Sequence, residues 1–360
     1  MNIKPYLYIV ITNLTMRKSL LGLAAGLVLL SSCSEDIDLT ANYKDITIVY
    51  GLINPESGPG VLADTVWVRI EKAFLGDGNA LLYAENADSI YYGPGLQAYV
   101  LAYNSSGVKV PADSFLLTRL VDPAGINKDT GMFAHTNTVL YQGVKAINTT
   151  YSYEVVIVKP NGDTTRSRTP ITRKVTMNTA PSSFDWEPDN ILVQEQTVTI
   201  RWVEDLNTYA YQPGIKFKYE EWDISNPGNV TNKSFTYYFP MFKLGIDYTC
   251  NTNQVCYEIK KSQFYTMIVN NIAQDPNKAR RFTNLDIIVL QASEELYNYI
   301  TINAPSLSYV QKVDAYTNIE NGLGIWGSRC SGGYTNMQLN NQTKDSLRLG
   351  RFTNQLNFQP

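Results

Sequence analysis

The feature that most limits the fold of this chain is a long succession of short segments in which apolar and polar residues alternate. Residues 45–54, 64–74 and 96–104 follow this pattern, and clusters of Gly, Pro, Asn and Ser separate them. An alternation with a period of two places one face of a strand in a core and the other in solvent. The chain also holds 25 Tyr residues among 360, and Tyr favours strands. The sequence therefore predicts a mainly β protein.

Turn signals between these segments predict hairpins. The residues from Asn104 to Gly107 separate two alternating runs, and Asn161-Gly162 separates two more. An Asn-Gly pair favours a type I′ turn, because both residues tolerate a positive φ. Tyr151, at the start of a strand, resembles the tyrosine corner of immunoglobulin and fibronectin-type sandwiches. The alternative interpretation of Tyr151 is an ordinary strand tyrosine.

The chain is expected to divide at residues 177–190, which are rich in Pro, Ser and Asn and lack periodicity. We expect an N-terminal β-sandwich over residues 44–178 and a C-terminal β-rich domain over residues 182–328. The predicted fold class is two immunoglobulin- or fibronectin-III-like β-sandwich modules, with a few short helices in the second. Residues 329–360 are polar and rich in Asn and Gln, which predicts a poorly ordered tail.

Two segments of the second module predict helices. Residues 260–275 carry Phe264 and Ile268 four positions apart, which places both on one helix face. Residues 293–303 begin with Ser293, a residue type that caps helices, and two glutamates follow it at the positive end of the helix dipole.

The N-terminal segment predicts export. A basic pair precedes an apolar run at residues 20–30, which is too short to span a membrane and is typical of a signal peptide. We assign the signal peptide to residues 1–32, and a start at Met16 would leave this signal complete. The residues before Cys33 resemble the lipobox of bacterial lipoproteins, in which the peptide is cut before a cysteine that takes a diacylglycerol. Cys33 is therefore the predicted lipidation site; the alternative is a plain secretory peptide.

Residues 33–43 are predicted to form an acidic tether behind the lipidated cysteine. The acidic cluster contains Ser34, Glu35, Asp36 and Asp38. It resembles the surface-export signal of Bacteroidota lipoproteins. We therefore expect the protein in the outer membrane, lipid-anchored and facing the extracellular side. The alternative is that these acids only solvate the tether.

The three remaining cysteines fit an oxidising compartment. Cys250 and Cys256 enclose a short polar loop, which suits a hairpin tip closed by a disulfide. Cys330 would then be left over, either buried or free. Three cysteines and a single histidine do not provide the ligand set of a structural zinc site.

The segment "NIENGLGIWGS" contains Gly322, Gly324 and Gly327 at the spacing of the dinucleotide fingerprint. A dinucleotide site needs these glycines between a strand and a helix, with an acid about 20 residues further on. The residues that follow do not form an amphipathic helix. We therefore interpret the segment as a structural turn motif, in which glycines permit the turn and Ile325 and Trp326 pack inward.

The sequence offers no catalytic constellation, so no catalytic residue is assigned. His135 is the only histidine, and no Gly-x-Ser-x-Gly motif is present. No metal and no cofactor are expected, and the acidic loop at residues 74–89 departs from the spacing of a calcium-binding EF-hand. The net charge is −3 without a basic stripe, which argues against a nucleic-acid partner. Paired carboxylates cannot be assigned, because 33 acidic residues make such pairs common by chance.

Four segments occur in the order "IVYGLIN", "KAFLGDGNA", "SEELYNYI" and "AYTNIENGLGIWGS". Together with the lipobox they resemble a Bacteroidota outer-membrane lipoprotein family that is catalogued only as a domain of unknown function. The resemblance covers the chain from about Asp38 to Ser328. It implies an association with TonB-dependent transporters of the starch-utilisation type, and it carries over no catalytic residues.

These observations lead to one functional expectation and two alternatives. We expect a surface-exposed, non-catalytic lipoprotein that captures a ligand or serves as an accessory subunit of a TonB-dependent transporter. Its partners would be the outer membrane, through the lipid anchor, and that transporter; the sequence identifies no ligand. The alternatives are a carboxylate-dependent hydrolase of glycans or peptides, and a structural or adhesion protein built of β modules.

Overall fold

The computed structural model describes residues 45–55, 64–73, 80–124, 138–177, 196–245, 249–251, 253–304 and 316–360. The chain is mainly β, with 55% strand and 16% helix, as predicted. Its strands form one large mixed sheet and one three-stranded sheet. An arrangement of two immunoglobulin-like sandwiches is not confirmed, because one continuous path of paired strands runs through both predicted modules. The boundary predicted between residues 178 and 182 lies outside the described residues.

Seven strands and two short helices form what we call the first region, residues 45–177. Side chains alternate along these strands as the sequence predicts: Val66 and Val68 are buried, whereas Thr65 and Arg69 are exposed. The elements are β1 (Ile46–Ile53), β2 (Asp64–Ala73), α2 (Ala80–Ala84), α3 (Ala87–Ile90), β3 (Gln97–Tyr103), β4 (Lys109–Val121), β5 (Val139–Lys145), β6 (Ser152–Val158) and β7 (Thr164–Pro170).

The sheet of the first region turns back on itself. Strand β4 pairs with β3 through its first part and with β5 through its last part. At the end of the path, Arg166 of β7 exchanges two backbone hydrogen bonds with Glu320, of 2.8 and 3.3 Å. Because Glu320 lies two residues before β15 (Gly322–Met337), this bridge joins the two ends of the path β15-β1-β2-β5-β4-β3-β6-β7. The result is a barrel-like sheet that encloses one apolar core.

A buried tyrosine hydroxyl that hydrogen-bonds to the backbone just upstream is present, but its residue is Tyr153 and not the predicted Tyr151. The hydroxyl of Tyr153 accepts a 2.9 Å hydrogen bond from the backbone N–H of Asn148, five residues upstream. Tyr153 is fully buried, whereas Tyr151 is only partly buried at the edge of the core. The prediction chose the wrong tyrosine because it placed the start of the strand one turn residue too early; β6 begins at Ser152.

Two predicted hairpins are present, one with a different turn. Strands β3 and β4 pair across a turn in which Gly107 has a φ of 75°. Between β6 and β7, Gly162 has a φ of 89° and its N–H donates to the carbonyl of Lys159 at 2.9 Å. Asn161 does not have a positive φ, so the predicted type I′ turn is wrong. A glycine that follows a four-residue turn provides the reversal instead.

The second region comprises residues 196–304 and 329–360. A long antiparallel sheet of β10, β9 and β14 covers an apolar core to which helix α4 and the chain's end contribute. The elements are β8 (Thr197–Val203), β9 (Ala210–Asp223), β10 (Asn226–Tyr238), β11 (Phe242–Lys243), β12 (Thr249–Asn251), β13 (Gln254–Lys260), α4 (Lys261–Asn271), β14 (Lys278–Ala292), α5 (Glu294–Ile302), α6 (Asn341–Leu349) and η2 (Asn354–Leu356). Strands β12, β13 and β8 form the three-stranded sheet.

Both predicted helices are confirmed. Helix α4 buries Phe264 and Ile268 on one face, as their spacing requires. Helix α5 has Ser293 as its N-cap residue. The side chain of Ser293 makes no cap hydrogen bond, and it accepts a 3.2 Å bond from the N–H of Ser328 instead. Helix α5 is therefore fastened to β15 at its first turn.

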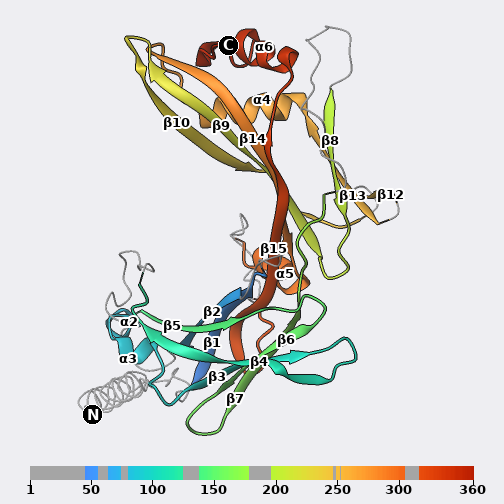
Figure 1. Cartoon of the computed structure of the whole chain (residues 1–360). Coiled ribbons are helices and arrows are strands. Elements are labelled where there is room, and N and C mark those ends of the chain that lie inside the picture. Colours follow the sequence, from blue (N-terminus) through green and yellow to red (C-terminus); the bar gives the residue numbers. More distant parts are fainter. Residues whose placement is uncertain are drawn as a thin grey trace, which may run out of the picture. The chain divides into compact units, whose positions relative to one another are not determined.

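Strand β15 joins the two regions, as Figure 1 shows in its course from β1 to β14. Its residues 322–328 pair with β1 in parallel, and residues 329–337 pair with β14 in antiparallel orientation. The partner changes between Ser328, which faces Ile53, and Arg329, which faces Ala292. One strand thus belongs to both regions, which is why the sheet is mixed.

The tail predicted to be poorly ordered is part of the fold. Residues 329–337 complete β15, and α6 and η2 follow. Leu347, Leu356 and Phe358 are buried in the core of the second region. Buried Arg280 holds this end of the chain through a 2.7 Å hydrogen bond to the carbonyl of Leu356. The tail was predicted to be poorly ordered because its composition is polar, but its few apolar residues are spaced so that they reach the core.

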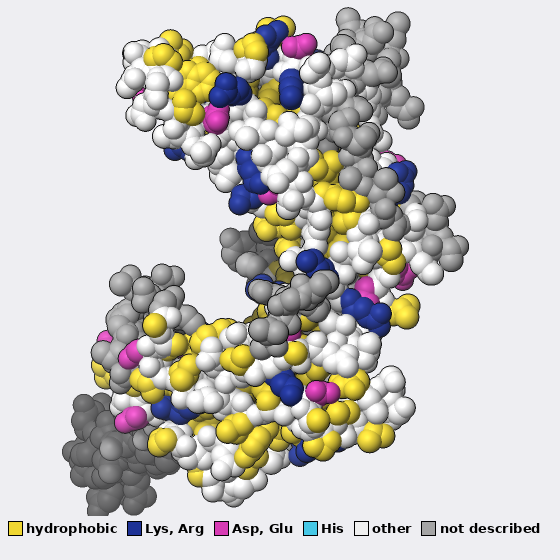
Figure 2. Space-filling model, in the orientation of Figure 1, with side chains coloured by type: hydrophobic (Ala, Val, Ile, Leu, Met, Phe, Trp, Pro, Cys, Tyr) yellow, Lys and Arg dark blue, Asp and Glu magenta, His cyan; other side chains and the backbone are white. Residues whose placement is uncertain are grey.

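The surface carries charges of both signs. Figure 2 shows Lys and Arg side chains interspersed with Asp and Glu, without one extended patch of a single sign on this face. No helix among the described residues is long and apolar enough to cross a membrane.

Candidate functional site

A pocket lies beside the point where β15 changes partner. Its volume is about 440 Å³, and fifteen residues line it. Arg329, Cys330 and Ser331 come from β15 directly after the change, and they face Ala292, Gln291 and Leu290 of β14. The other lining residues come from β1 and the residue after it, from β9, from the end of β10 and the following turn, and from α5. The pocket exists because β1 and β14 pair with different halves of the same strand.

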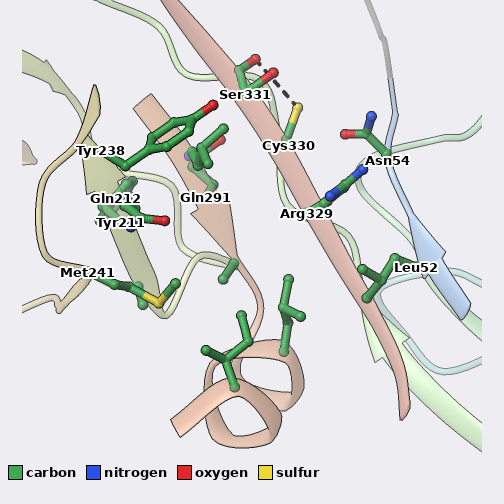
Figure 3. A pocket seen from close by; sticks show the side chains of 15 residues that line it. Leu52, Asn54, Tyr211, Gln212, Tyr238, Met241, Gln291, Arg329, Cys330 and Ser331 are labelled. Atoms are coloured by element: carbon green, nitrogen blue, oxygen red, sulfur yellow. Dashed lines mark hydrogen bonds between the residues drawn. The ribbon is translucent and has the colours of Figure 1, made fainter. Parts of the chain in front are cut away.

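Apolar side chains form most of the wall. Helix α5 contributes Leu296 and Ile300, and a small apolar cluster continues the wall towards β9 and β14. In the view of Figure 3, Leu52 and Met241 lie on opposite sides of β15. Concave pockets of this kind, mainly apolar with a few polar groups, are typical of small-molecule sites. The apolar lining residues are Leu52, Ala210, Met241, Leu290, Ala292, Leu296 and Ile300.

The side chain of Gln291 lies on the opposite face of the sheet from the pocket. Gln291 faces Cys330 of β15 and Tyr211 of β9, in the same alternating row as Val289 of the core. The residue is only 2% exposed, and its amide makes no hydrogen bond of good geometry, although it lies close enough to the hydroxyl of Tyr211 to offset part of the rise that burial causes in the pKa of that phenol. Gln291 is therefore a buried polar residue of the core and not a ligand contact.

Among the described residues that line the pocket, Arg329 is the only one with a charged side chain. Its side chain is exposed, and no carboxylate of the described residues forms an ion pair with it. None of the fifteen lining residues is acidic. The electrostatic field of the lining therefore favours an anionic group.

Two tyrosines belong to the residues around the pocket, but the ring of Tyr211 is fully buried in the core of the second region. The hydroxyl of Tyr211 accepts a 3.1 Å hydrogen bond from the backbone N–H of Asp205. Burial raises the pKa of Tyr211 above its usual value, so this phenol stays neutral at physiological pH. Tyr238 is 43% exposed and lies at the rim, where its ring can contact a ligand and solvent together.

The thiol of Cys330 is not an activated nucleophile. Cys330 is free and buried, and its Sγ donates to the carbonyl of Pro55 at 3.3 Å. Burial raises the pKa of the thiol, which opposes formation of the thiolate. The sequence left open whether this cysteine is buried or free, and it is both. The pocket can bind and orient a ligand, but this thiol does not equip it for covalent catalysis.

The structural motif predicted at Gly322, Gly324, Trp326 and Gly327 lies in strand β15 and not in a turn. Each residue from Gly322 to Ser328 faces a residue of β1 in a parallel ladder. The turn prediction was wrong because glycines in a strand also mark a close approach of backbones. Gly324 has a φ of 108°, and a Cβ there would collide with the carbonyl oxygen of Val49.

Trp326 links the segment "IVYGLIN" in β1 to the segment "AYTNIENGLGIWGS", which ends in β15. Its indole is fully buried and donates a 2.9 Å hydrogen bond to the carbonyl of Tyr153. Gly51 of β1 faces it, and a Cβ at Gly51 would lie 2.6 Å from the Trp326 ring. Asn318 binds the backbone N–H and C=O of Trp326 at 3.0 and 2.7 Å. The inward packing predicted for Trp326 is confirmed, and Ile325 is buried in a separate cluster.

Some of the other predicted site residues lie outside the described residues. The lipidation site Cys33 and the export signal Ser34, Glu35, Asp36 and Asp38 lie outside them, as does His135. Strands β12 and β13 form a hairpin that carries Cys250 and Cys256, and Cys256 is disulfide-bonded. The side chain of Cys250 is not described, so its pairing with Cys256 stays a prediction.

Sequence reasoning missed the pocket. Arg329 was assigned to the tail, and no local pattern marks it as part of a pocket. Among the described residues, no group of three or more His, Cys, Asp or Glu is placed to hold a metal ion. No protein-family model matches the chain, and no curated protein matches it. The family resemblance therefore stays a prediction.

Proposed function

We propose that this protein is a surface-exposed, lipid-anchored outer-membrane protein that captures a small ligand in the pocket beside β15. The observation that carries the binding role is the mainly apolar pocket of about 440 Å³ in which Arg329 is the one charged side chain among the described lining residues. An apolar wall with a single exposed guanidinium suits a ligand that has an apolar part and an anionic or hydrogen-bond-accepting group. The lipid anchor rests on the segment that ends at Cys33, and surface display rests on the acids that follow it.

Ligand capture is tested with the full chain and two variants. Arg329→Gln removes the charge from the pocket, and Arg201→Gln, at an exposed arginine of β8 outside the pocket, is the matched control. Thermal-shift screening against small peptides, carboxylic acids and oligosaccharides should find a ligand that stabilises the wild-type protein. That stabilisation should fall in Arg329→Gln and persist in Arg201→Gln. Equal stabilisation of the wild type and Arg329→Gln by every ligand would refute the site.

Lipid anchoring and surface display are tested in cells. Metabolic labelling with an alkyne fatty acid should mark the wild-type protein and not the Cys33→Ser variant. External protease should degrade the wild-type protein on intact cells, and replacement of Glu35, Asp36 and Asp38 by Ser should protect it. Labelling that survives Cys33→Ser contradicts the anchor. Protection of the wild-type protein contradicts surface display.

We further propose that the captured ligand passes to a TonB-dependent transporter, for which this protein serves as an accessory subunit. The support is the order of the four segments that resemble the lipoprotein family, together with a pocket suited to binding rather than catalysis. Chemical cross-linking in intact cells, followed by purification through the lipoprotein, should recover such a transporter. Recovery of the cross-linked lipoprotein without any transporter contradicts this role.

The first region is, we propose, derived from an immunoglobulin- or fibronectin-type sandwich whose two sheets have been joined by β4 and by the bridge to Glu320. The support is the buried Tyr153 hydroxyl on the backbone of Asn148, which resembles a tyrosine corner. An experimental structure in which this hydrogen bond is absent would remove that support.

A further inference from the structure

We infer that the ligand of the β15 pocket is an aliphatic monocarboxylate, a single acyl chain that ends in one carboxylate. This inference rests on the proposed role in ligand capture and names the chemical class of that ligand. Three features of the pocket carry it: one exposed guanidinium, a wall of aliphatic side chains, and a floor whose backbone groups are already paired in the sheet.

The guanidinium of Arg329 belongs to a row of short side chains. In the register of the sheet, Arg329 faces Ala292 of β14, which in turn faces Ala210 of β9, so the three side chains lie on one face. Leu296 of helix α5 packs against the two alanines. All four residues line the pocket. Because the alanine side chains are short, space remains between the sheet, the helix and the guanidinium.

The charge of Arg329 selects an acid. The residue is exposed, has no ion pair among the described residues, and shares the described lining with no acidic side chain. A guanidinium binds a carboxylate through two parallel, charge-assisted hydrogen bonds. A ligand with a free ammonium group would lose water at this lining without gaining a carboxylate in return. A ligand with one negative charge and no positive charge therefore suits the pocket.

The wall selects an aliphatic chain. The aliphatic side chains of the lining, apart from the two alanines, are Leu52, Met241, Leu290, Leu296 and Ile300. Each ligand methylene that such a wall buries strengthens binding by up to about 4-fold. The volume of about 440 Å³ lies towards the lower end of small-molecule pockets, which span roughly 300–1,000 Å³. A single chain of moderate length fits this space.

The floor of the pocket offers little to a peptide or a glycan. Strand β14 pairs with β9 on one side and with β15 on the other, so its backbone groups at the pocket are part of the two ladders. The side-chain amide of Gln212, which faces Leu290 on the pocket side of the sheet, donates to the carbonyl of Phe239 at 3.1 Å. A peptide or a glycan carries many polar groups that would lose water here without new partners. An acyl chain has no such groups.

Isothermal titration calorimetry with the full chain tests the inference. Hexanoate, octanoate and decanoate form a chain-length series, and octanamide is the neutral match of octanoate. The affinity should rise by up to about 4-fold for each methylene that the pocket buries. Octanoate should bind about 3- to 5-fold more tightly than octanamide, because only the acid forms an ion pair with the exposed guanidinium.

Two pairs of variants locate the site. Arg329→Gln should reduce the preference for octanoate over octanamide to nearly one, whereas Arg201→Gln, at an exposed arginine outside the pocket, should retain it. Ile300→Ser should weaken the binding of decanoate by at least about 3-fold, because it removes aliphatic contacts from the wall. Ile302→Ser is the control: Ile302 is 41% exposed, Ile300 is 44% exposed, and both belong to α5, but Ile302 does not line the pocket.

The outcomes separate this inference from the proposed function. An affinity that does not grow with chain length, or a preference for the acid that survives Arg329→Gln, overturns the aliphatic carboxylate. So does an affinity for decanoate that Ile300→Ser and Ile302→Ser change equally. Leucyl-leucine and maltose are titrated in parallel, and if either binds more tightly than decanoate and loses affinity in Arg329→Gln, ligand capture stands and the aliphatic class is wrong. If decanoate does not bind, this inference is overturned, and the thermal-shift screen decides on ligand capture separately.

Discussion

The two halves of β15 differ in how completely their surroundings satisfy polar groups. Along residues 322–328, the ladder with β1, Asn318 and the side chain of Ser293 provide partners on both sides of the strand. Along residues 329–331, Arg329 is exposed beside the pocket and stands without an ion pair among the described residues. One strand therefore carries a structural half, where every defect should cost stability, and a half that borders the pocket for which we propose ligand capture.

The structural half should be most sensitive at Gly324. Gly324→Val introduces a β-branched side chain at a φ of 108° and drives its Cβ into the carbonyl oxygen of Val49. We expect a loss on the order of 4 kcal/mol or more in the free energy of unfolding, measured by urea denaturation, or a failure to accumulate folded protein. Gly93→Ala, at a glycine with open space around it, should change stability by less than about 1 kcal/mol. Equal stability of the two variants would contradict the structural role of the first half of β15.

The burial of Tyr153 in the first region should make the protein less stable at alkaline pH. Burial raises the pKa of Tyr153 from 10.0 to about 12. The folded protein retains this proton where the unfolded chain releases it, so the stabilisation is complete below about pH 10 and is lost as the pH rises towards 12. The loss amounts to roughly 3 kcal/mol.

Urea unfolding at several pH values between 9 and 12 measures this loss. Tyr153→Phe should flatten the decline of stability, whereas Tyr151→Phe, at the partly buried neighbour, should retain the wild-type slope. If both variants kept the same slope as the wild type, Tyr153 would not be the group that titrates.

Asn318 should matter less than Gly324 but more than any surface amide. Asn318→Ala removes the two side-chain hydrogen bonds to the backbone of Trp326. We expect a loss of about 2 kcal/mol, because the exposed N–H and C=O regain only part of their partners from water. Asn226→Ala, at an exposed position in β10, is the matched control and should stay within about 0.5 kcal/mol of the wild type. A similar effect of both substitutions would show that Asn318 does not act through Trp326.

The core face of β14 predicts the opposite sign. Gln291→Leu replaces a buried amide that makes no hydrogen bond of good geometry by an apolar side chain of similar size, so the protein should gain about 1 kcal/mol in stability. Gln212→Leu removes the 3.1 Å hydrogen bond to the carbonyl of Phe239 and should destabilise the protein by a similar amount. Calorimetric melting of both variants without ligand gives the two signs. A destabilised Gln291→Leu protein would place Gln291 among the structural residues.

Local patterns carried most of the correct predictions. Helices α4 and α5 depend on apolar spacing and on capping residues within one segment, and the hairpin at Gly107 depends on a few adjacent residues. The errors arose where the partner is distant in sequence. Gly324 was assigned to a turn because its reason, the backbone of Val49, lies 275 positions earlier in the sequence. Leu347 and Phe358 were assigned to a disordered tail because their core belongs to strands far upstream.

The sequence by itself determined the mainly β class and the two helices, since alternation and capping act over neighbouring residues. It also carries the predicted export signal and lipidation cysteine, which are properties of a linear segment. Only the tertiary structure decided that β15 changes partner between Ser328 and Arg329, and that a pocket with Arg329 in its lining lies beside that point. Distant segments can form hydrogen bonds with the same strand, and no local pattern in β15 shows which of them will pair with it.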